Sequence, residues 1–93
     1  MSRRIRLTDA QVYTLRKIKN GITALLRGDG SRGDIDNGGR IVNCPSLPVL
    51  FREGLVDFRS EGKQLSHSWY YVKLTPDGIK AAIGAQTREE RGL

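Results

Sequence analysis

Residues 27–39 read RGDGSRGDIDNGG and contain five glycines and three aspartates, a composition that cannot propagate a helix. Glycine loses the most backbone freedom on ordering, and aspartate side chains compete for the backbone hydrogen bonds of a helix. The chain has 93 residues, which is the size of one domain. The segment therefore divides a single domain into a front part before it and a back part after it. We expect it to be a mobile turn that joins short strands at 22–27 and 39–43 as an irregular hairpin.

Three short motifs with functions in other proteins also fall in this segment. The glycines of residues 28–33 have the G-x-G-x-x-G spacing of dinucleotide-binding loops, but that loop requires a following helix inside a βαβ unit. The aspartates of residues 29–36 miss the ligand positions of a calcium-binding loop. The Arg-Gly-Asp tripeptide at 32–34 would act only after export, for which the sequence has no signal. We therefore expect no cofactor and no metal site.

A helix is predicted to begin after Thr8. Thr8 and Gln11 have the spacing of a capping box, and Asp9 suits the positive end of the helix dipole. Apolar residues then recur at helical spacing, at Val12, Leu15, Ile18 and Ile22. The pair Asn20-Gly21 is a typical helix end.

A second helix is predicted from Ser46, taken as its N-cap, to Gly54, with Pro48 in its first turn. Alternating apolar and polar residues predict strands at 55–59 and 69–74, joined by a polar loop.

The last helix is expected to begin at Thr75, an N-cap followed by Pro76, and to end at Gly84. Residues 85–93 are predicted to form a flexible tail.

The runs LFREGLVDF (50–58) and YYVKLTPDGIKA (70–81) resemble the back half of winged helix-turn-helix domains of the MarR and PadR kind. The resemblance covers residues 46–84 and implies a recognition helix at 46–53 followed by a β-hairpin wing. In the front half, the Gly/Asp-rich segment occupies the place of the family's second helix.

The fold expected is therefore a small α+β, winged-helix-like domain with about three helices, a C-terminal hairpin wing and the additional irregular hairpin near 22–43. It would comprise residues 8–84, between a basic arm at 1–7 and the tail.

The net charge of +6 lies entirely in the first third of the chain. Residues 1–27 contain seven Lys and Arg against one Asp, whereas residues 28–93 contain nine basic and nine acidic residues. A concentrated positive surface attracts polyanions through its long-range field and through counterion release. We therefore expect duplex DNA as the partner and a small transcriptional regulator as the protein.

The resemblance and the charge together select twelve candidate DNA contacts. The resemblance implies that the second helix enters the major groove and that the wing contacts phosphates or the minor groove, while the basic arm can lie along a minor groove. The candidates are Arg3, Arg4, Arg6, Arg16, Lys17, Lys19, Ser46, Arg52, Arg59, Lys63, Gln64 and His67.

Three consecutive aromatic residues, at 69–71, cannot all face the core of a strand. Alternation directs Tyr70 inward and places Trp69 and Tyr71 on the other face with Lys73. Such a pair can stack on bases, anchor a protein partner, or pack beneath the first helix or a terminus. The alternative function is thus a protein-interaction module on a winged-helix scaffold, such as a small phage-type inhibitor of a host protein or nucleoprotein. A homodimer is compatible with either function.

The sequence gives little indication of catalysis or of membrane insertion. His67 is the single histidine and has no catalytic partner at a recognisable spacing, so we do not expect an enzyme. Cys44, the single cysteine, is expected to be a small buried thiol. The longest apolar runs are far below the ~20 residues of a membrane span, and a cytoplasmic location is expected.

Overall fold

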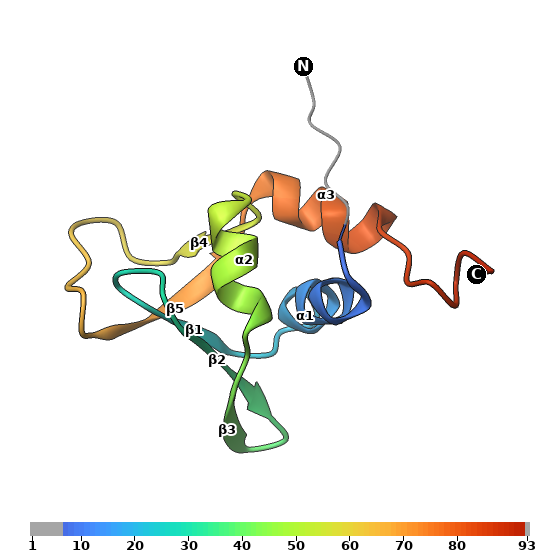
Figure 1. The fold of residues 1–93 in the computed structure, drawn as a ribbon. Coiled ribbons are helices and arrows are strands. Elements are labelled where there is room, and N and C mark those ends of the chain that lie inside the picture. Colours follow the sequence, from blue (N-terminus) through green and yellow to red (C-terminus); the bar gives the residue numbers. More distant parts are fainter. Residues whose placement is uncertain (1–6, 93) are drawn as a thin grey trace.

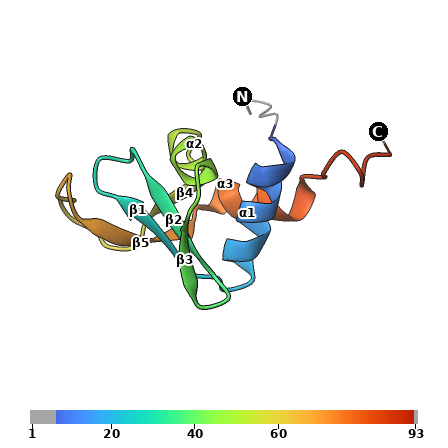
Figure 2. The same cartoon turned by 60° about the horizontal axis from the view of Figure 1, so that its bottom comes forward.

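The structure, a computed structural model, describes residues 7–92 and contains three helices and one antiparallel five-stranded sheet (Figure 1). The elements in chain order are α1 (Asp9–Lys19), β1 (Ala24–Arg27), β2 (Gly33–Asn37), β3 (Arg40–Asn43), α2 (Ser46–Arg52), β4 (Val56–Phe58), β5 (Trp69–Leu74) and α3 (Pro76–Gly84). The strand order across the sheet is β3-β2-β1-β5-β4. The helices lie to one side of this twisted sheet, as the turned view makes plain (Figure 2).

The α1 helix follows the sequence prediction closely. The Thr8 hydroxyl accepts a hydrogen bond from the Gln11 amide at 3.2 Å, and the Gln11 side chain accepts one from the Thr8 amide at 3.0 Å. This capping box fixes the start of the helix, and Gly21, with φ of 97°, follows its end. Val12, Leu15 and Ile18 are buried on the side of the helix that faces the core.

The pairing predicted for the front half is wrong. Segment 22–27 does not pair with 39–43, because residues 33–37 form a strand of their own that lies between β1 and β3. Ile35 of this strand is opposite Ala24 on one side and Val42 on the other. The turn from β2 to β3 consists of Gly38 and Gly39, both with positive φ, and such two-residue turns favour a tight hairpin.

Glycine has a packing role in β2. Gly33 and Ile35 face the core while Asp34 and Asp36 point to the other side, so the strand alternates as a half-buried strand should. A Cβ on Gly33 would lie 2.3 Å from the Leu47 Cβ, a contact that real Cβ atoms essentially never make. The missing side chain therefore lets α2 pack directly against β2.

The α2 helix begins differently from the prediction. Its N-cap is Pro45, which makes no side-chain cap, and Ser46 is the first helical residue. Pro45 already has helical dihedral angles, with φ of −62° fixed by its ring, so the helix starts one residue earlier than a serine cap would allow. Leu47 and Leu50 are fully buried, and Gly54, with φ of 75°, provides the predicted exit into the next strand.

The two strands predicted at 55–59 and 69–74 pair as the antiparallel β4–β5 hairpin. Val56 is opposite Leu74, and Phe58 is opposite Val72. The other edge of β5 pairs with β1, with Leu25 opposite Tyr71, so β5 lies inside the sheet. Thr75 then caps α3 by accepting a hydrogen bond from the Gly78 amide at 3.0 Å, as its position in the sequence predicts.

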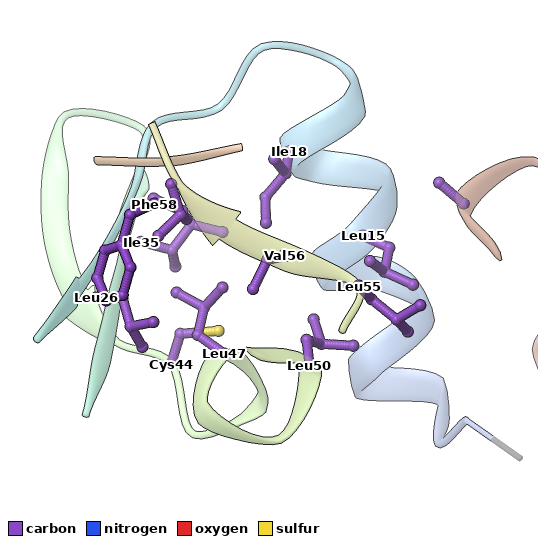
Figure 3. Packing of buried hydrophobic residues seen from close by; sticks show 13 residues of the cluster. Leu15, Ile18, Leu26, Ile35, Cys44, Leu47, Leu50, Leu55, Val56 and Phe58 are labelled. Atoms are coloured by element: carbon purple, nitrogen blue, oxygen red, sulfur yellow. The ribbon is translucent and has the colours of Figure 1, made fainter. Parts of the chain in front are cut away.

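The hydrophobic core lies between the sheet and the three helices (Figure 3). Leucines from α1, β1 and α2 form its centre, and Phe58 makes edge-to-face contacts with Phe51 and Tyr70 at ring-centroid distances of 5.2 and 5.8 Å. Cys44 is buried as predicted, with its sulfur 3.6 Å from the Thr14 hydroxyl.

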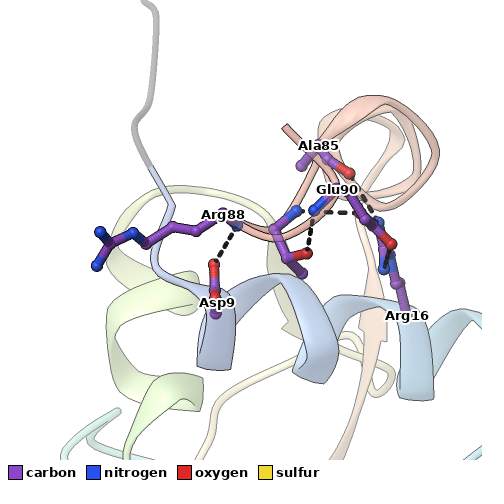
Figure 4. A network of polar contacts seen from close by, with 6 residues as sticks. Asp9, Arg16, Ala85, Arg88 and Glu90 are labelled. Atoms are coloured by element: carbon purple, nitrogen blue, oxygen red, sulfur yellow. Dashed lines mark hydrogen bonds and ion pairs between the residues drawn. The ribbon is translucent and has the colours of Figure 1, made fainter. Parts of the chain in front are cut away.

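Residues 85–92, for which the sequence predicts a flexible tail, have defined contacts with α1 (Figure 4). Arg16 forms a bidentate ion pair with Glu90, at 2.6 and 2.8 Å, and donates a third bond to the Ala85 carbonyl. The Arg88 amide donates to the Asp9 carboxylate at 2.9 Å, and Thr87 is buried. The Arg16 hydrogen bonds lower the pKa of Glu90 to about 2, and the same pair raises the pKa of Arg16.

Candidate nucleic-acid interface

The side of the sheet away from the helices carries a group of large side chains that we call the open sheet face. Trp69 and Tyr71 are 40% and 55% exposed there, which confirms the alternation predicted for β5. Antiparallel register brings residues of β1 and β4 beside them. The open sheet face consists of Leu25, Arg27, Asp57, Arg59, Trp69, Tyr71 and Lys73.

Tyr71 lies between two neighbours on this face. Leu25 is directly opposite it on β1, and on the other side the Arg59 amide donates to the Tyr71 carbonyl at 2.9 Å. The guanidinium carbon of Arg59 lies 5.7 Å from the centre of the Tyr71 ring, within the range of a cation–π contact. The Arg59 Nε also donates to the Val72 carbonyl at 3.2 Å. These contacts hold the positive charge of Arg59 beside the aromatic ring.

Trp69 has an arginine neighbour of its own. Arg27 is directly opposite it on β1, and the Arg27 Nη2 donates to the His67 Nδ1 at 2.9 Å. Arginine has no acceptor, so the Nδ1 of His67 is the acceptor in this bond. The Arg27 Nε is buried without a hydrogen-bond partner among residues 7–92. The open sheet face thus presents two aromatic rings: Tyr71 lies beside the guanidinium group of Arg59, and Trp69 lies opposite Arg27 on the neighbouring strand.

The loop between β4 and β5, residues 59–68, extends beyond the sheet, and hydrogen bonds hold it at its base. The Gly28 amide donates to the Ser68 carbonyl at 2.9 Å, and the Leu65 amide donates to the Tyr70 hydroxyl at 2.8 Å. A Cβ on Gly28 would lie 2.0 Å from the Leu65 carbonyl oxygen, so this loop packs closely on the end of β1. Lys63 and His67 are exposed on it. The hairpin loop therefore presents its polar side chains at the end of the open sheet face.

The structure brings some of the twelve candidate DNA contacts together and separates others. Arg59, Lys63, Gln64 and His67 share the β4–β5 hairpin with the aromatic pair. Lys17 and Lys19 are exposed on α1, and Arg52 is exposed on α2, but these helices lie on the opposite side of the sheet.

The remaining candidates differ in their availability. Ser46 is half-buried at the start of α2, and the guanidinium group of Arg16 is occupied by Glu90 and Ala85. Arg3, Arg4 and Arg6 lie outside the described residues.

Sequence reasoning missed Arg27 as a site residue. Alternation within 22–27 places Leu25 and Arg27 on one face of a strand, but nothing local indicates that this strand pairs with β5. The pairing joins residues more than forty positions apart, and only that contact places Arg27 beside Trp69.

Other kinds of site find no counterpart in this part of the chain. Within residues 7–92 no three His, Cys, Asp or Glu side chains are arranged to hold a metal ion. Nor is any helix of the described residues long and apolar enough to cross a membrane.

Comparisons of the chain with models of known protein families, with curated proteins and with solved structures found no match.

Proposed function

We propose that the protein is a small nucleic-acid-binding domain of the winged-helix type, which binds duplex DNA as a transcriptional regulator. The observation that carries this proposal is the position of the cations on the β4–β5 hairpin. Arg59 and Lys63 lie on its exposed loop, and Arg27 adjoins the loop through its hydrogen bond to His67. Hairpin loops of this kind suit contacts to phosphates or to the minor groove.

The charge of the whole chain supports the same partner. The excess of +6 comes from the first third of the sequence, including the basic arm, and long-range attraction to a polyanion follows from it. The exposed Lys17 and Lys19 can add phosphate contacts from α1.

In this proposal α2 has a supporting role. It is seven residues long, and its two leucines are buried against the sheet. Arg52 is the long cationic side chain that it exposes. One such residue suits a phosphate contact better than the reading of several base edges, which requires several side chains on one helix.

The direct test measures binding of a labelled duplex by fluorescence anisotropy at two salt concentrations. We expect binding at low salt that weakens as salt rises, and a weaker complex for Lys63→Ala. Lys80→Ala is the matched control, because Lys80 is an exposed lysine on α3, away from the hairpin. A folded protein that binds no duplex at low salt would refute the proposal.

The exposed Trp69, Tyr71 and Leu65 favour a protein-interaction module as the second candidate, since exposed aromatic residues are typical anchors of protein interfaces. Capture of a specific protein that is lost in Trp69→Ala, with DNA affinity unchanged, would favour this alternative. The homodimer proposal has its own indication, because Tyr13 on α1 and Ile79 and Ile83 on α3 are exposed. Light scattering of the purified protein measures that oligomeric state.

A further inference from the structure

We propose that the open sheet face binds unpaired bases, so that the protein holds single-stranded or locally opened nucleic acid by stacking bases on Trp69 and Tyr71. This inference rests on the proposed nucleic-acid-binding function and names a second ligand class for the same hairpin.

The two rings have the arrangement that stacking requires. Trp69 and Tyr71 are two residues apart on one strand, so their positions are about 6.8 Å apart along it. The helices lie to the other side of the sheet (Figure 2), and the exposed fractions of 40% and 55% leave ring surface of Trp69 and Tyr71 free for a ligand. Every base has an aromatic face, so such a pair accepts bases of any sequence.

Charge favours a nucleic-acid strand over an uncharged ligand. Arg27 flanks Trp69, Arg59 lies over Tyr71, and Lys73 follows on the same side of β5. Against these three cations the face carries one acidic residue, Asp57, which is opposite Lys73. Bases can therefore lie on the rings while phosphates contact the flanking cations.

Acidic residues on β2 mark where the basic and aromatic part of this face ends. Asp34 and Asp36 point to the same side of the sheet from β2, next to β1. Their carboxylates repel phosphates, so the basic and aromatic part of the face is confined to β1, β5 and β4. A bound strand is therefore expected to run along β5 toward the hairpin loop rather than across β2 and β3.

The geometry selects unpaired bases over paired ones. Inside a duplex, each base already stacks on its neighbours, and its faces are not available to a flat protein surface. In a single strand the bases can turn outward and lie on exposed aromatic rings. DNA and RNA share this chemistry, so both are included in the test.

The protein contains one tryptophan and three tyrosines, so tryptophan emission, excited at a wavelength that tyrosine does not absorb, reports on the open sheet face alone. We would titrate the full chain with a 12-nucleotide single-stranded DNA, the RNA of the same sequence and a duplex of that DNA, at one low salt concentration. At least one of the two single strands should bind with saturation and quench Trp69 emission. The duplex should bind with little quenching.

Substitutions then separate stacking from general attraction. Tyr71→Ala should weaken single-strand binding roughly 5- to 150-fold, the range expected for the loss of one stacked base, and duplex binding by less than about threefold. Tyr13→Ala is the matched control, because Tyr13 is 47% exposed on α1, on the other side of the sheet. Circular dichroism verifies that each variant is folded, and Tyr71→Phe, which keeps the ring, should retain single-strand binding.

The outcomes distinguish this inference from the proposed function. Duplex binding with no quenching by single strands, or equal effects of Tyr71→Ala and Tyr13→Ala, would overturn the stacking site and leave duplex binding in place. Single-strand binding without duplex binding would support the stacking site and refute the duplex proposal. Failure of all three nucleic acids to bind would refute both and leave a protein partner as the use of this face.

Discussion

At Gly78 the backbone of α3 passes so close to Leu55, the residue before β4, that no side chain fits between them. A Cβ there would lie 1.9 Å from the Leu55 carbonyl oxygen, and backbone atoms cannot move aside as a flexible side chain can. Gly78 lies in the first turn of α3, where its amide donates to the Thr75 hydroxyl, so it fixes where α3 meets the rest of the fold.

We therefore expect Gly78→Ala to lower the free energy of unfolding by about 1–3 kcal/mol, the usual cost of an overpacked site. Gly84, at the other end of α3, meets nothing within 4 Å at its Cβ position, so Gly84→Ala should be neutral or stabilising by up to about 1 kcal/mol. Urea unfolding of both variants measures the difference. Equal stability of the two variants would contradict the close contact.

Single residues account for the parts of the fold that the sequence predicted well. Thr8 and Thr75 start α1 and α3 because their hydroxyl groups accept amide hydrogen bonds from residues three positions later. Gly54 ends α2 because it adopts a positive φ. Each signal lies within a few residues of its effect and can therefore be recognised in the sequence alone.

At the scale of elements, β2 shows where sequence reasoning fails. Its residues GDIDN include one apolar side chain, and glycine and aspartate are poor strand formers. The strand exists because Gly33 fits under Leu47 and because β1 and β3 supply hydrogen bonds on both sides. These causes are tertiary contacts, which local composition does not reveal, and for that reason the composition of this segment predicts a turn.

The contact between α1 and residues 85–92 should depend on pH. The folded pKa of Glu90 is about 2, below its ordinary value of 4.5, so the ion pair stabilises the contact above pH 4.5. This stabilisation is lost as the pH falls from 4.5 through about 2, where Glu90 takes up a proton. Arg16 stays charged throughout, because the ordinary pKa of arginine lies far above this range and the pair with Glu90 raises the pKa of Arg16 further.

Amide chemical shifts of Thr87 and Arg88, followed by NMR from pH 6 downward, should therefore change toward detached values as Glu90 is protonated. Glu90→Gln should give the detached shifts already at neutral pH. Glu89→Gln, at the exposed neighbouring residue, should leave them unchanged and serves as the control. Identical spectra for the two variants would show that the Arg16–Glu90 pair does not hold this segment.

At the scale of the whole molecule, the sequence predicted the α+β class and the three helices, but not the order of the strands. The open sheet face depends on that order, since it takes residues from β1, β5 and β4. The aromatic pair was recognised from alternation alone, whereas its arginine neighbours required the pairing of distant strands.

The uneven charge along the chain leads to a prediction about salt. If Arg3, Arg4 and Arg6 each neutralise one phosphate of a DNA duplex, removal of residues 1–6 should reduce the slope of log affinity against log salt by up to ~2.7, at ~0.9 per contact. A control that loses three exposed cations elsewhere, Arg40→Gln with Lys80→Gln and Arg91→Gln, should change the slope less. Equal changes would mean that net charge matters and that the arm makes no contacts of its own.

The place of β1 inside the sheet also constrains how the protein is made. β1, β2 and β3 follow one another closely in the chain, so they leave the ribosome at nearly the same time and can pair as a local meander. The second edge of β1 stays unpaired until β5, more than forty residues later, has been synthesised. Until then the apolar side chains of Ala24 and Leu26 also lack their full core contacts. During that interval a nascent chain has an unpaired strand edge, the kind of surface on which neighbouring chains misassemble. Pairing of β5 with β1 removes this hazard.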